Sequence, residues 1–301
     1  MFQNPEQVLL IASVILFLSI FAGKAGYRFG LPALLLFLGV GMLFGSDGLG
    51  IQFSDPNVAQ FIGMLALSII LFSGGMDTKV AEVKPIASQG VVLATLGVLA
   101  TTFITGGFIY WLFGLFGKYV TLTFPESLLL AAVMSSTDSA SVFSILRSKG
   151  VYLKERLRPT LELESGSNDP IAYMLTVIGI YILNGDNLIK VPYVIFAQIV
   201  YGVLIGIGLA VAAIYVLTRT DIIVNGLDTI FILAVVLLGL GLSQLVGGNE
   251  FLCIYLFGIL LGNSRIRNKG NIVPFFDGVT TLAQIVISVS YTHLTLPTKL
   301  E

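Results

Sequence analysis

Two polar stretches of this sequence lie within long apolar runs. The first reads SSTDSAS at residues 135–141, and the second reads ELESGSNDP at residues 162–170. An aspartate at the centre of a membrane helix costs on the order of 2.5–3.5 kcal/mol on insertion scales, so it is seldom kept without a use. We therefore predict that these stretches form a functional site. The alternative is a structural polar network that only joins helices.

The spacing of the second stretch places its oxygen atoms on one side of a helix. Ser165 and Asp169 are four residues apart and share a face, and Glu164 and Asn168 share the adjacent stripe. Carboxylate, hydroxyl and carbonyl oxygens suit an alkali or alkaline-earth cation. Zinc and copper are disfavoured because the chain has a single cysteine and no histidine outside its C-terminal tail.

Two features predict that backbone groups open toward this site. Pro170 lacks an amide donor and frees the carbonyl one turn earlier, and the hydroxyl groups around Asp138 compete with helical hydrogen bonds. Neighbouring carboxylates in a low-dielectric site favour uptake of a proton, whereas a bound cation favours its release. We therefore expect the site to hold either a proton or a cation, which is the physical basis of exchange.

The composition is that of an integral membrane protein. Of the 301 residues, 56% are hydrophobic and 11% are charged, and the mean hydropathy is +0.95, whereas soluble domains are about a quarter charged. The single cysteine, Cys253, excludes a disulfide scaffold. The formal net charge of −1 gives no attraction to nucleic acid. We therefore expect the lipid bilayer as a partner and no nucleic acid.

The apolar runs predict an all-α fold, a polytopic bundle of transmembrane helices. About 20 apolar residues are needed for a helix to cross a bilayer, and these runs are continuous and do not alternate as barrel strands would. Ten spans are predicted, at residues 8–23, 31–46, 58–75, 89–117, 126–145, 161–183, 193–217, 228–247, 250–263 and 274–288.

The basic residues test this layout, because cytoplasmic loops carry an excess of them. Lysines and arginines cluster on every second loop, and the intervening loops contain only Lys118 and Lys190. This alternation predicts a multi-pass protein of the cell inner (plasma) membrane with its N-terminus outside. The N-terminal MFQNPEQ has no basic residue, so the first span is expected to be an anchor and not a cleavable signal peptide.

The second and ninth predicted spans share a pattern. LGVGMLFGS, which ends at Ser46, aligns with YLFGILLGN, which ends at Asn263, and both contain a GxxxG motif. The two spans would run in opposite directions through the membrane, as an inverted-topology repeat of a secondary transporter requires. The alternative is a pair of ordinary small-residue packing faces.

The C-terminal segment, residues 289–301, differs sharply from the apolar run before it. One reverse translation of Val289 to Leu294 gives a transposase end sequence used in sequencing libraries, so we expect an adapter artefact here, with a genuine polar C-terminus as the alternative. The only histidine, His293, is left out of the candidate site for this reason. We also expect the natural protein to continue beyond this segment.

The combined motifs resemble the NhaP-type branch of the monovalent cation/proton antiporter-1 family, close to its potassium/proton antiporters. They read TLELESGSND, SSTDSASVFSILRSKG, GLPALLLFLGVGMLFGSDGLG and ILFSGGMDTKVAEVKP, and the similarity covers residues 1–287. The resemblance implies a homodimeric antiporter that exchanges protons for K+ or Na+ without a cofactor. It also implies thirteen spans and a mobile ion-carrying core that works by alternating access.

The resemblance also assigns roles to residues of the two polar stretches. Its ion-binding aspartates, where a proton or a monovalent cation would bind, fall on Asp138 in an unwound part of span five and on Asp169 in span six. The supporting ligands fall on the Thr137 carbonyl, Glu164 and Ser165. Further support is assigned to Asn168 and Glu162, and the pair Asn168-Asp169 implies electroneutral exchange. Ser139 stands where many relatives have proline.

The resemblance divides the chain into functional parts. Residues 1–75 correspond to dimerisation-type spans, 89–183 to the first half of the ion-transport core, 193–217 to a linking span and 228–288 to further dimerisation-type spans. Three further core spans, including a second crossing helix and an arginine that pairs with Glu164, are expected beyond this chain. On that expectation the chain by itself would not transport.

Two other functions use similar residues. An intramembrane aspartyl protease also has two membrane aspartates, but its second one is the aspartate of a GxGD motif, and here Asp169 follows Gly166-Ser167-Asn168. A passive cation channel aligns carbonyls or charge rings by oligomeric symmetry, whereas an inverted repeat with carboxylates at mid-membrane favours a carrier. Obligatory coupling of cation flux to a proton gradient distinguishes the carrier from the channel.

Overall fold

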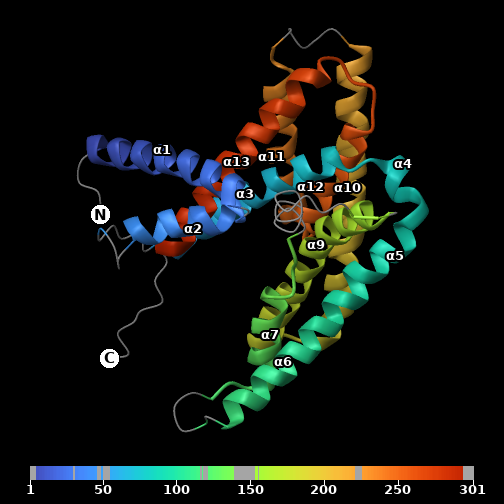
Figure 1. Cartoon of the computed structure of the whole chain (residues 1–301). Coiled ribbons are helices and arrows are strands. Elements are labelled where there is room, and N and C mark those ends of the chain that lie inside the picture. The colour runs from blue at the N-terminus through green and yellow to red at the C-terminus, as the bar shows by residue number, and fades with distance from the viewer. Residues whose placement is uncertain are drawn as a thin grey trace. The chain divides into compact units, whose positions relative to one another are not determined.

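The computed structural model describes residues 5–29, 31–45, 49, 55–115, 117, 121–138, 153–154, 156–220 and 226–293 (Figure 1). All regular structure in these ranges is helical, which confirms the predicted all-α class. The helices in chain order are α1 (Pro5–Phe29), α2 (Ala33–Phe44), α3 (Pro56–Asp77), α4 (Val80–Val83), α5 (Ala87–Val92), α6 (Val98–Leu115), α7 (Phe124–Val133), α9 (Leu157–Leu183), α10 (Val191–Arg219), α11 (Asp228–Val246), α12 (Glu250–Gly262) and α13 (Lys269–His293). The 3-10 turns η1 (Lys84–Ile86) and η3 (Leu188–Lys190) and the π-helical segment η2 (Leu93–Gly97) connect some of them.

Each of the ten predicted spans overlaps a helix. In the part of the chain that the structure describes, six helical stretches are long and apolar enough to cross a bilayer. They are Leu9–Gly26, Pro56–Asp77, Val80–Leu115, Leu188–Arg219, Asp228–Val246 and Lys269–Val289. Helices α2, α7 and α12 are apolar but shorter. Helix α9 has 27 residues, and the polar residues of the second stretch lower its hydropathy.

One predicted boundary is wrong, and the fifth span is described only in part. The fourth span begins at Val80 and not at residue 89, because Pro85 lies at the start of η1, where its missing N–H is not needed, and the helix continues through it. The fifth span, predicted over residues 126–145, is helical only to Val133 among the described residues. The rest of that span from Ser139 onward lies outside the residues that the structure describes.

The chain forms two compact units, each with its own packing. The first contains the residues up to Ile70 and those from Pro274 onward, and the second contains Leu71–Asp138 and Leu153–Val273. The second unit therefore holds both polar stretches as far as the structure describes them. The predicted division into dimerisation-type and core spans is a functional one and stays a prediction.

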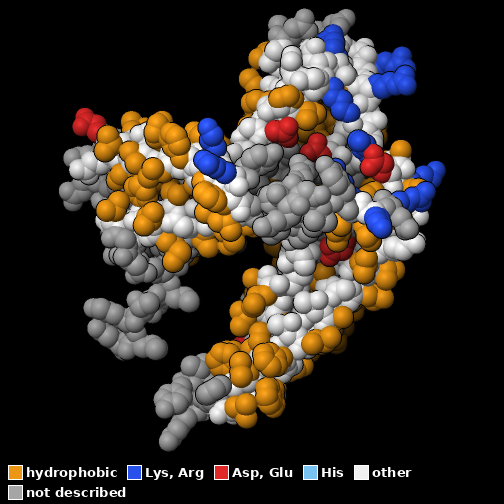
Figure 2. Space-filling model, viewed as in Figure 1, with side chains coloured by type: hydrophobic (Ala, Val, Ile, Leu, Met, Phe, Trp, Pro, Cys, Tyr) orange, Lys and Arg blue, Asp and Glu red, His pale blue; other side chains and the backbone are white. Residues whose placement is uncertain are grey.

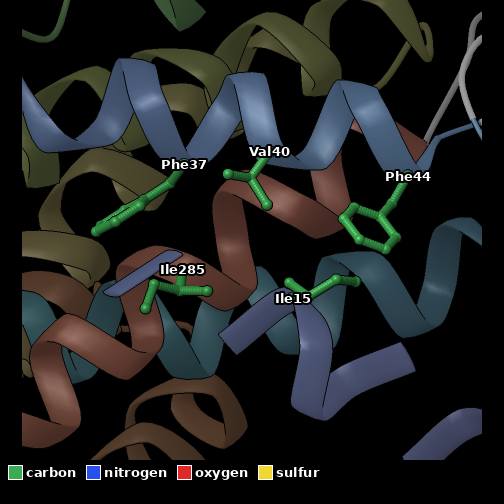
Figure 3. Packing of buried hydrophobic residues seen from close by; sticks show 5 residues of the cluster. All are labelled: Ile15, Phe37, Val40, Phe44 and Ile285. Atoms are coloured by element: carbon green, nitrogen blue, oxygen red, sulfur yellow. The ribbon is translucent and has the colours of Figure 1, made fainter. Parts of the chain in front are cut away.

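In the first unit, helix α2 packs through one face. Phe37, Val40 and Phe44 are three or four residues apart, so their side chains project from the same side of the helix. They point toward Ile15 of α1 and Ile285 of α13 (Figure 3), and all five residues are buried. Helix α13 continues through His293, so the change of composition at residue 289 is not a helix end, and an adapter origin for residues 289–301 stays a prediction.

In the second unit, α12 lies against α3 through two glycines of the GxxxG motif. Any Cβ at Gly258 or Gly262 would overlap the backbone of Phe72 or Met76. The absence of side chains therefore lets the two helices approach closely, as a small-residue packing face predicts. The inverted repeat that the same motif suggested stays a prediction.

Large apolar side chains cover the outer faces of several helices. Figure 2 shows them gathered over α1 and α6, and the exposed fractions reach 71% for Leu9, 73% for Ile104 and 59% for Trp111. A soluble monomer rarely exposes contiguous apolar patches larger than a few hundred Å². These faces therefore suit contact with lipid.

Candidate functional site

Helix α7 leads into the first polar stretch and ends just before it. The helix starts with a capping box, in which the Thr123 N–H donates to Glu126 Oε2 at 2.7 Å and the Glu126 N–H donates to Thr123 Oγ1 at 3.4 Å. At the other end, the N–H and the hydroxyl of Ser135 both donate to the Ala132 carbonyl, at 3.2 and 2.7 Å. These bonds replace the next helical bond, so Ser135–Asp138 are not helical, as the hydroxyl-rich sequence predicts.

Helix α9 carries the second polar stretch past this non-helical segment. Ser165 and Asn168 are buried, with exposed fractions of 9% and 0%, and Pro170 lies inside the helix without ending it. The Ser165 hydroxyl donates to the Thr137 carbonyl at 2.9 Å. This bond gives a partner to a backbone carbonyl that is not in a helix.

Ser136 links the non-helical segment to Asp169. Its hydroxyl donates to Asp169 Oδ1 in a short contact and approaches Asn168 Oδ1 at 3.3 Å. Ser136 lies within the first polar stretch, and its sequence position alone gives no sign of this individual role. A hydroxyl group can donate to a carboxylate and can also offer its lone pairs, so this residue belongs to the site by geometry.

Thr137 links the same segment to the adjacent stripe of α9. Its Oγ1 is 3.2 Å from both carboxylate oxygens of Glu164 and donates to them, and it accepts from Asn168 Nδ2 at 2.6 Å. Asn168 Nδ2 also donates to Glu164 Oε1 at 2.9 Å. The structure therefore brings together Ser136, Thr137, Glu164, Ser165, Asn168 and Asp169, and these residues from the two stretches form one connected set.

The charges of this set are negative. In the part of the chain that the structure describes, neither Glu164 nor Asp169 has a lysine or arginine partner. Asp138 follows Thr137 directly, and both Asp138 and Glu164 lie close enough to act electrostatically on Asp169. Hydroxyl and amide donors hold the carboxylates, and an arrangement of this kind suits a proton or a cation.

Glu162 lies outside this connected set. It accepts a hydrogen bond from Arg158 Nε at 2.8 Å, one helical turn earlier, and this bond with the carboxylate raises the pKa of the Arg158 guanidinium. The hydrogen bond found for Glu162 among the described residues thus goes to Arg158 and not to the set, and its supporting role stays a prediction.

Tyr255 of α12 is a site neighbour that sequence analysis missed. It is 3% exposed, and a Cβ at Gly166 of α9 would lie 2.5 Å from its hydroxyl oxygen. Gly166 therefore leaves the space in which the Tyr255 ring lies against α9. A tyrosine in an apolar span gives no sequence signal for this, since its partner is distant in the chain.

Most of the chain matches one known protein family. The chain matches the family described as sodium/hydrogen exchanger, transmembrane, over residues 11–291. The chain belongs to the sodium/hydrogen exchanger family. It is therefore a multi-pass membrane protein of a secondary-transporter family and not an enzyme, and the resemblance seen in its motifs is confirmed.

Individual relatives agree with this membership. The exchanger chain is 40% identical over 281 residues to the K(+)/H(+) antiporter NhaP2 of Shewanella sp. (strain ANA-3), covering 92% of this chain and 47% of that protein. It is 37% identical over 295 residues to the K(+)/H(+) antiporter NhaP of Alkalimonas amylolytica, covering 97% and 50%. The chain thus spans about half the length of these curated relatives.

A solved structure shows the same fold. The sodium proton antiporter MjNhaP1 from Methanocaldococcus jannaschii at pH 8 matches with a TM-score of 0.81 and 21% sequence identity. The match covers 97% of this exchanger chain and 71% of that one. The chain therefore shares the fold of that structure.

Proposed function

We propose that the protein containing this chain exchanges protons for monovalent cations, K+ or Na+, by alternating access. The observation that carries the proposal is the bonding of Ser136 and Thr137 to Asp169 and Glu164, which joins a non-helical segment to two carboxylates on α9. Membership of the exchanger family supports it. The names of the two relatives make K+ the first cation to test.

The same oxygens can serve the proton and the cation. When Asp169 is ionised, the Ser136 hydroxyl donates to it, and a cation at Asp138 and Asp169 would receive lone pairs from that hydroxyl after it rotates. The Thr137 carbonyl, Glu164 and Ser165 are the proposed supporting ligands. A proton on Asp169 removes the charge that attracts the cation, so binding of the two is mutually exclusive.

Asn168 sets the proposed charge balance. Its amide holds Thr137 and Glu164 by donating hydrogen bonds and carries no charge itself. One proton would therefore leave for each monovalent cation that binds, and the exchange is electroneutral.

The cellular setting is part of the proposal. We infer a homodimer in the cell inner membrane with the N-terminus outside, on the grounds of the family and of the alternation of basic loops. No cofactor takes part, and protons and K+ or Na+ are the transported species.

Everted membrane vesicles from cells that express the gene test this function. A respiration-driven proton gradient is monitored with a pH-sensitive dye, and KCl or NaCl is expected to dissipate it, whereas choline chloride is not. Asp169→Asn and Asp138→Asn are each expected to abolish the effect, because an amide cannot exchange a proton for a cation.

Glu82→Gln is the matched control for loss of a carboxylate. Glu82 is about half exposed and pairs with Lys79 on the surface, so its replacement is expected to leave exchange unchanged. Retained exchange in Asp169→Asn at wild-type protein levels would rule out the assigned site.

A further inference from the structure

A buried polar cluster lies at the start of α12, outside the candidate site but in contact with the same helix. Asn249 and Glu250 are 2% and 3% exposed, although they follow the short connection from α11. Both side chains reach α9 within one turn after Asp169. The proposed exchange makes no use of this contact.

Asn249 is bonded in three directions. Its N–H donates to the Gln198 carbonyl of α10 at 3.0 Å, and its Oδ1 accepts from the Leu252 N–H at 3.0 Å and so caps α12. Its Nδ2 donates to the Pro170 carbonyl at 2.8 Å. Pro170 follows Asp169 directly, so Asn249 fixes the backbone of α9 at the residue next to the carboxylate.

Glu250 holds the same helix one turn later. Its Oε1 accepts from the Tyr173 hydroxyl at 2.8 Å and from Gln244 Nε2 at 3.4 Å. In the described part of the chain, Glu250 has no lysine or arginine partner. A buried carboxylate without a cation is costly, but a hydrogen bond to it is about twice as strong as one between neutral groups. A carboxylate at position 250 therefore makes a stronger hydrogen bond to the Tyr173 hydroxyl than a glutamine amide would.

Tyr173 is fixed by its ring as well as by its hydroxyl. It lies four residues after Asp169 and therefore on the same face of α9. Its ring contacts that of Phe251 edge to face, with centroids 4.7 Å apart at 85°. An edge-to-face pair of this kind adds to the packing energy, so Tyr173 is held at two points by consecutive residues of α12.

The start of α12, which makes these contacts, is itself tightly packed against α10. A Cβ at Gly202 of α10 would lie 2.8 Å from the Asn249 carbonyl oxygen, so backbone meets backbone there. Gly247 ends α11 in the left-handed region with φ of 73°. The connection between α11 and α12 therefore has little room to shift against α10.

We propose that Asn249 and Glu250 are positioning residues, which act through the Pro170 carbonyl and the Tyr173 hydroxyl to hold Asp169 against Ser136 and thereby set the affinity for the transported cation. The proposal rests on the exchange function proposed above. A positioning role differs from a purely structural one in the effect of removing these contacts. Their loss raises the cation KM, whereas the maximal rate and the amount of folded protein are preserved.

The test compares variants that alter one bond at a time, in the protein as its gene encodes it. Tyr173→Phe removes the hydroxyl and keeps the ring contact, and Glu250→Gln keeps an acceptor without its charge. The matched control is Tyr181→Phe on the same helix, since no hydrogen bond of the Tyr181 hydroxyl is found among the described residues. The rate of cation-driven proton movement is measured against KCl and NaCl concentration.

The expected rise in the cation KM depends on how much of the Tyr173–Glu250 hydrogen bond each variant keeps. Tyr173→Phe is expected to raise the cation KM about tenfold with a maximal rate within about twofold of wild type. Glu250→Gln is expected to raise it about threefold, and Tyr181→Phe to leave it unchanged. The double variant Tyr173→Phe/Glu250→Gln is expected to resemble Tyr173→Phe alone, because both act through one bond. An unchanged KM in Tyr173→Phe, or a lower maximal rate with unchanged KM, would overturn the proposal.

Hydrogen–deuterium exchange separates this proposal from the proposed function. Amides of residues 165–173 are expected to exchange faster in Tyr173→Phe than in Tyr181→Phe, whether or not the protein transports. If wild-type vesicles show no cation-driven proton movement, the proposed antiport function fails. The hydrogen–deuterium exchange rates then still decide whether the Tyr173–Glu250 bond holds α9 in place. Equal amide exchange in the two variants would overturn the positioning role even in an active transporter.

Discussion

Replacing Asn168 with alanine removes the amide that joins the two halves of the candidate site. Its Nδ2 donates to Thr137 Oγ1 at 2.6 Å and to Glu164 Oε1 at 2.9 Å, and the side chain is 0% exposed. A hydrogen bond between neutral side chains contributes about 0.6 kcal/mol in a membrane protein, and one to a carboxylate about 1.5–3 kcal/mol. Their loss is expected to lower the free energy of unfolding by roughly 2–3.5 kcal/mol.

Denaturant titration of the purified protein in detergent measures this difference. The matched control is Asn184→Ala, because Asn184 lies at the C-terminal end of the same helix, is exposed, and has no side-chain hydrogen bond among the described residues. The control is expected to change the free energy of unfolding by less than about 0.5 kcal/mol. Equal stabilities of Asn168→Ala and Asn184→Ala would refute the claim that Asn168 holds the two polar stretches together.

Three further predictions concern packing, charge balance and the outlying carboxylate. Gly202→Ala is expected to destabilise the protein by about 1–3 kcal/mol, because the added Cβ would lie 2.8 Å from the Asn249 carbonyl oxygen. The control Gly208→Ala lies on the same helix, where an added Cβ meets nothing within 4 Å, and it should not destabilise the protein. Thermal melts in which Gly208→Ala is the less stable variant would contradict this. The initial rate of cation/proton exchange in proteoliposomes is expected to be independent of an imposed membrane potential, and a clear voltage dependence would disprove electroneutral exchange. Glu162→Gln is expected to leave exchange in everted vesicles within about twofold of wild type, since Glu162 pairs with the exposed Arg158, and complete loss of exchange would show that Glu162 supports the site.

The shared faces of α9 could be predicted from short-range spacing, whereas the bonds from Ser136 to Asp169 and from Thr137 to Glu164 join residues 33 and 27 apart and could not. Residues four apart share a helix face, and this places Ser165 with Asp169 and Glu164 with Asn168 without any knowledge of the fold. The hydroxyl-rich run predicted the break after α7, and the structure confirms it at Ser135–Asp138. The predicted start of the fourth span at residue 89 was wrong because proline tolerates the first turn of a helix as well as its end, and the helical stretch through Pro85 begins at Val80.

The contacts from α12 could not be predicted from the sequence. Tyr173 and Glu250 are 77 residues apart, and Pro170 and Asn249 are 79 residues apart. Nothing in the local pattern of an apolar helix selects which tyrosine meets which carboxylate, because that choice depends on how the helices cross. Gly166 is the one local sign of the contact with Tyr255, and a glycine inside a membrane helix has many possible packing partners.

Obligatory coupling of cation and proton flux is the measurement that tests the central claim most directly. The protein as its gene encodes it is reconstituted into liposomes that contain a pH-sensitive dye, and an outward K+ or Na+ gradient is imposed with the membrane potential clamped at zero. We predict that protons enter against their own gradient as the cation leaves, with one proton for each cation, and that Asp169→Asn abolishes both fluxes. Cation efflux without proton entry would contradict the account, because it would show a passive pathway instead of an exchanger.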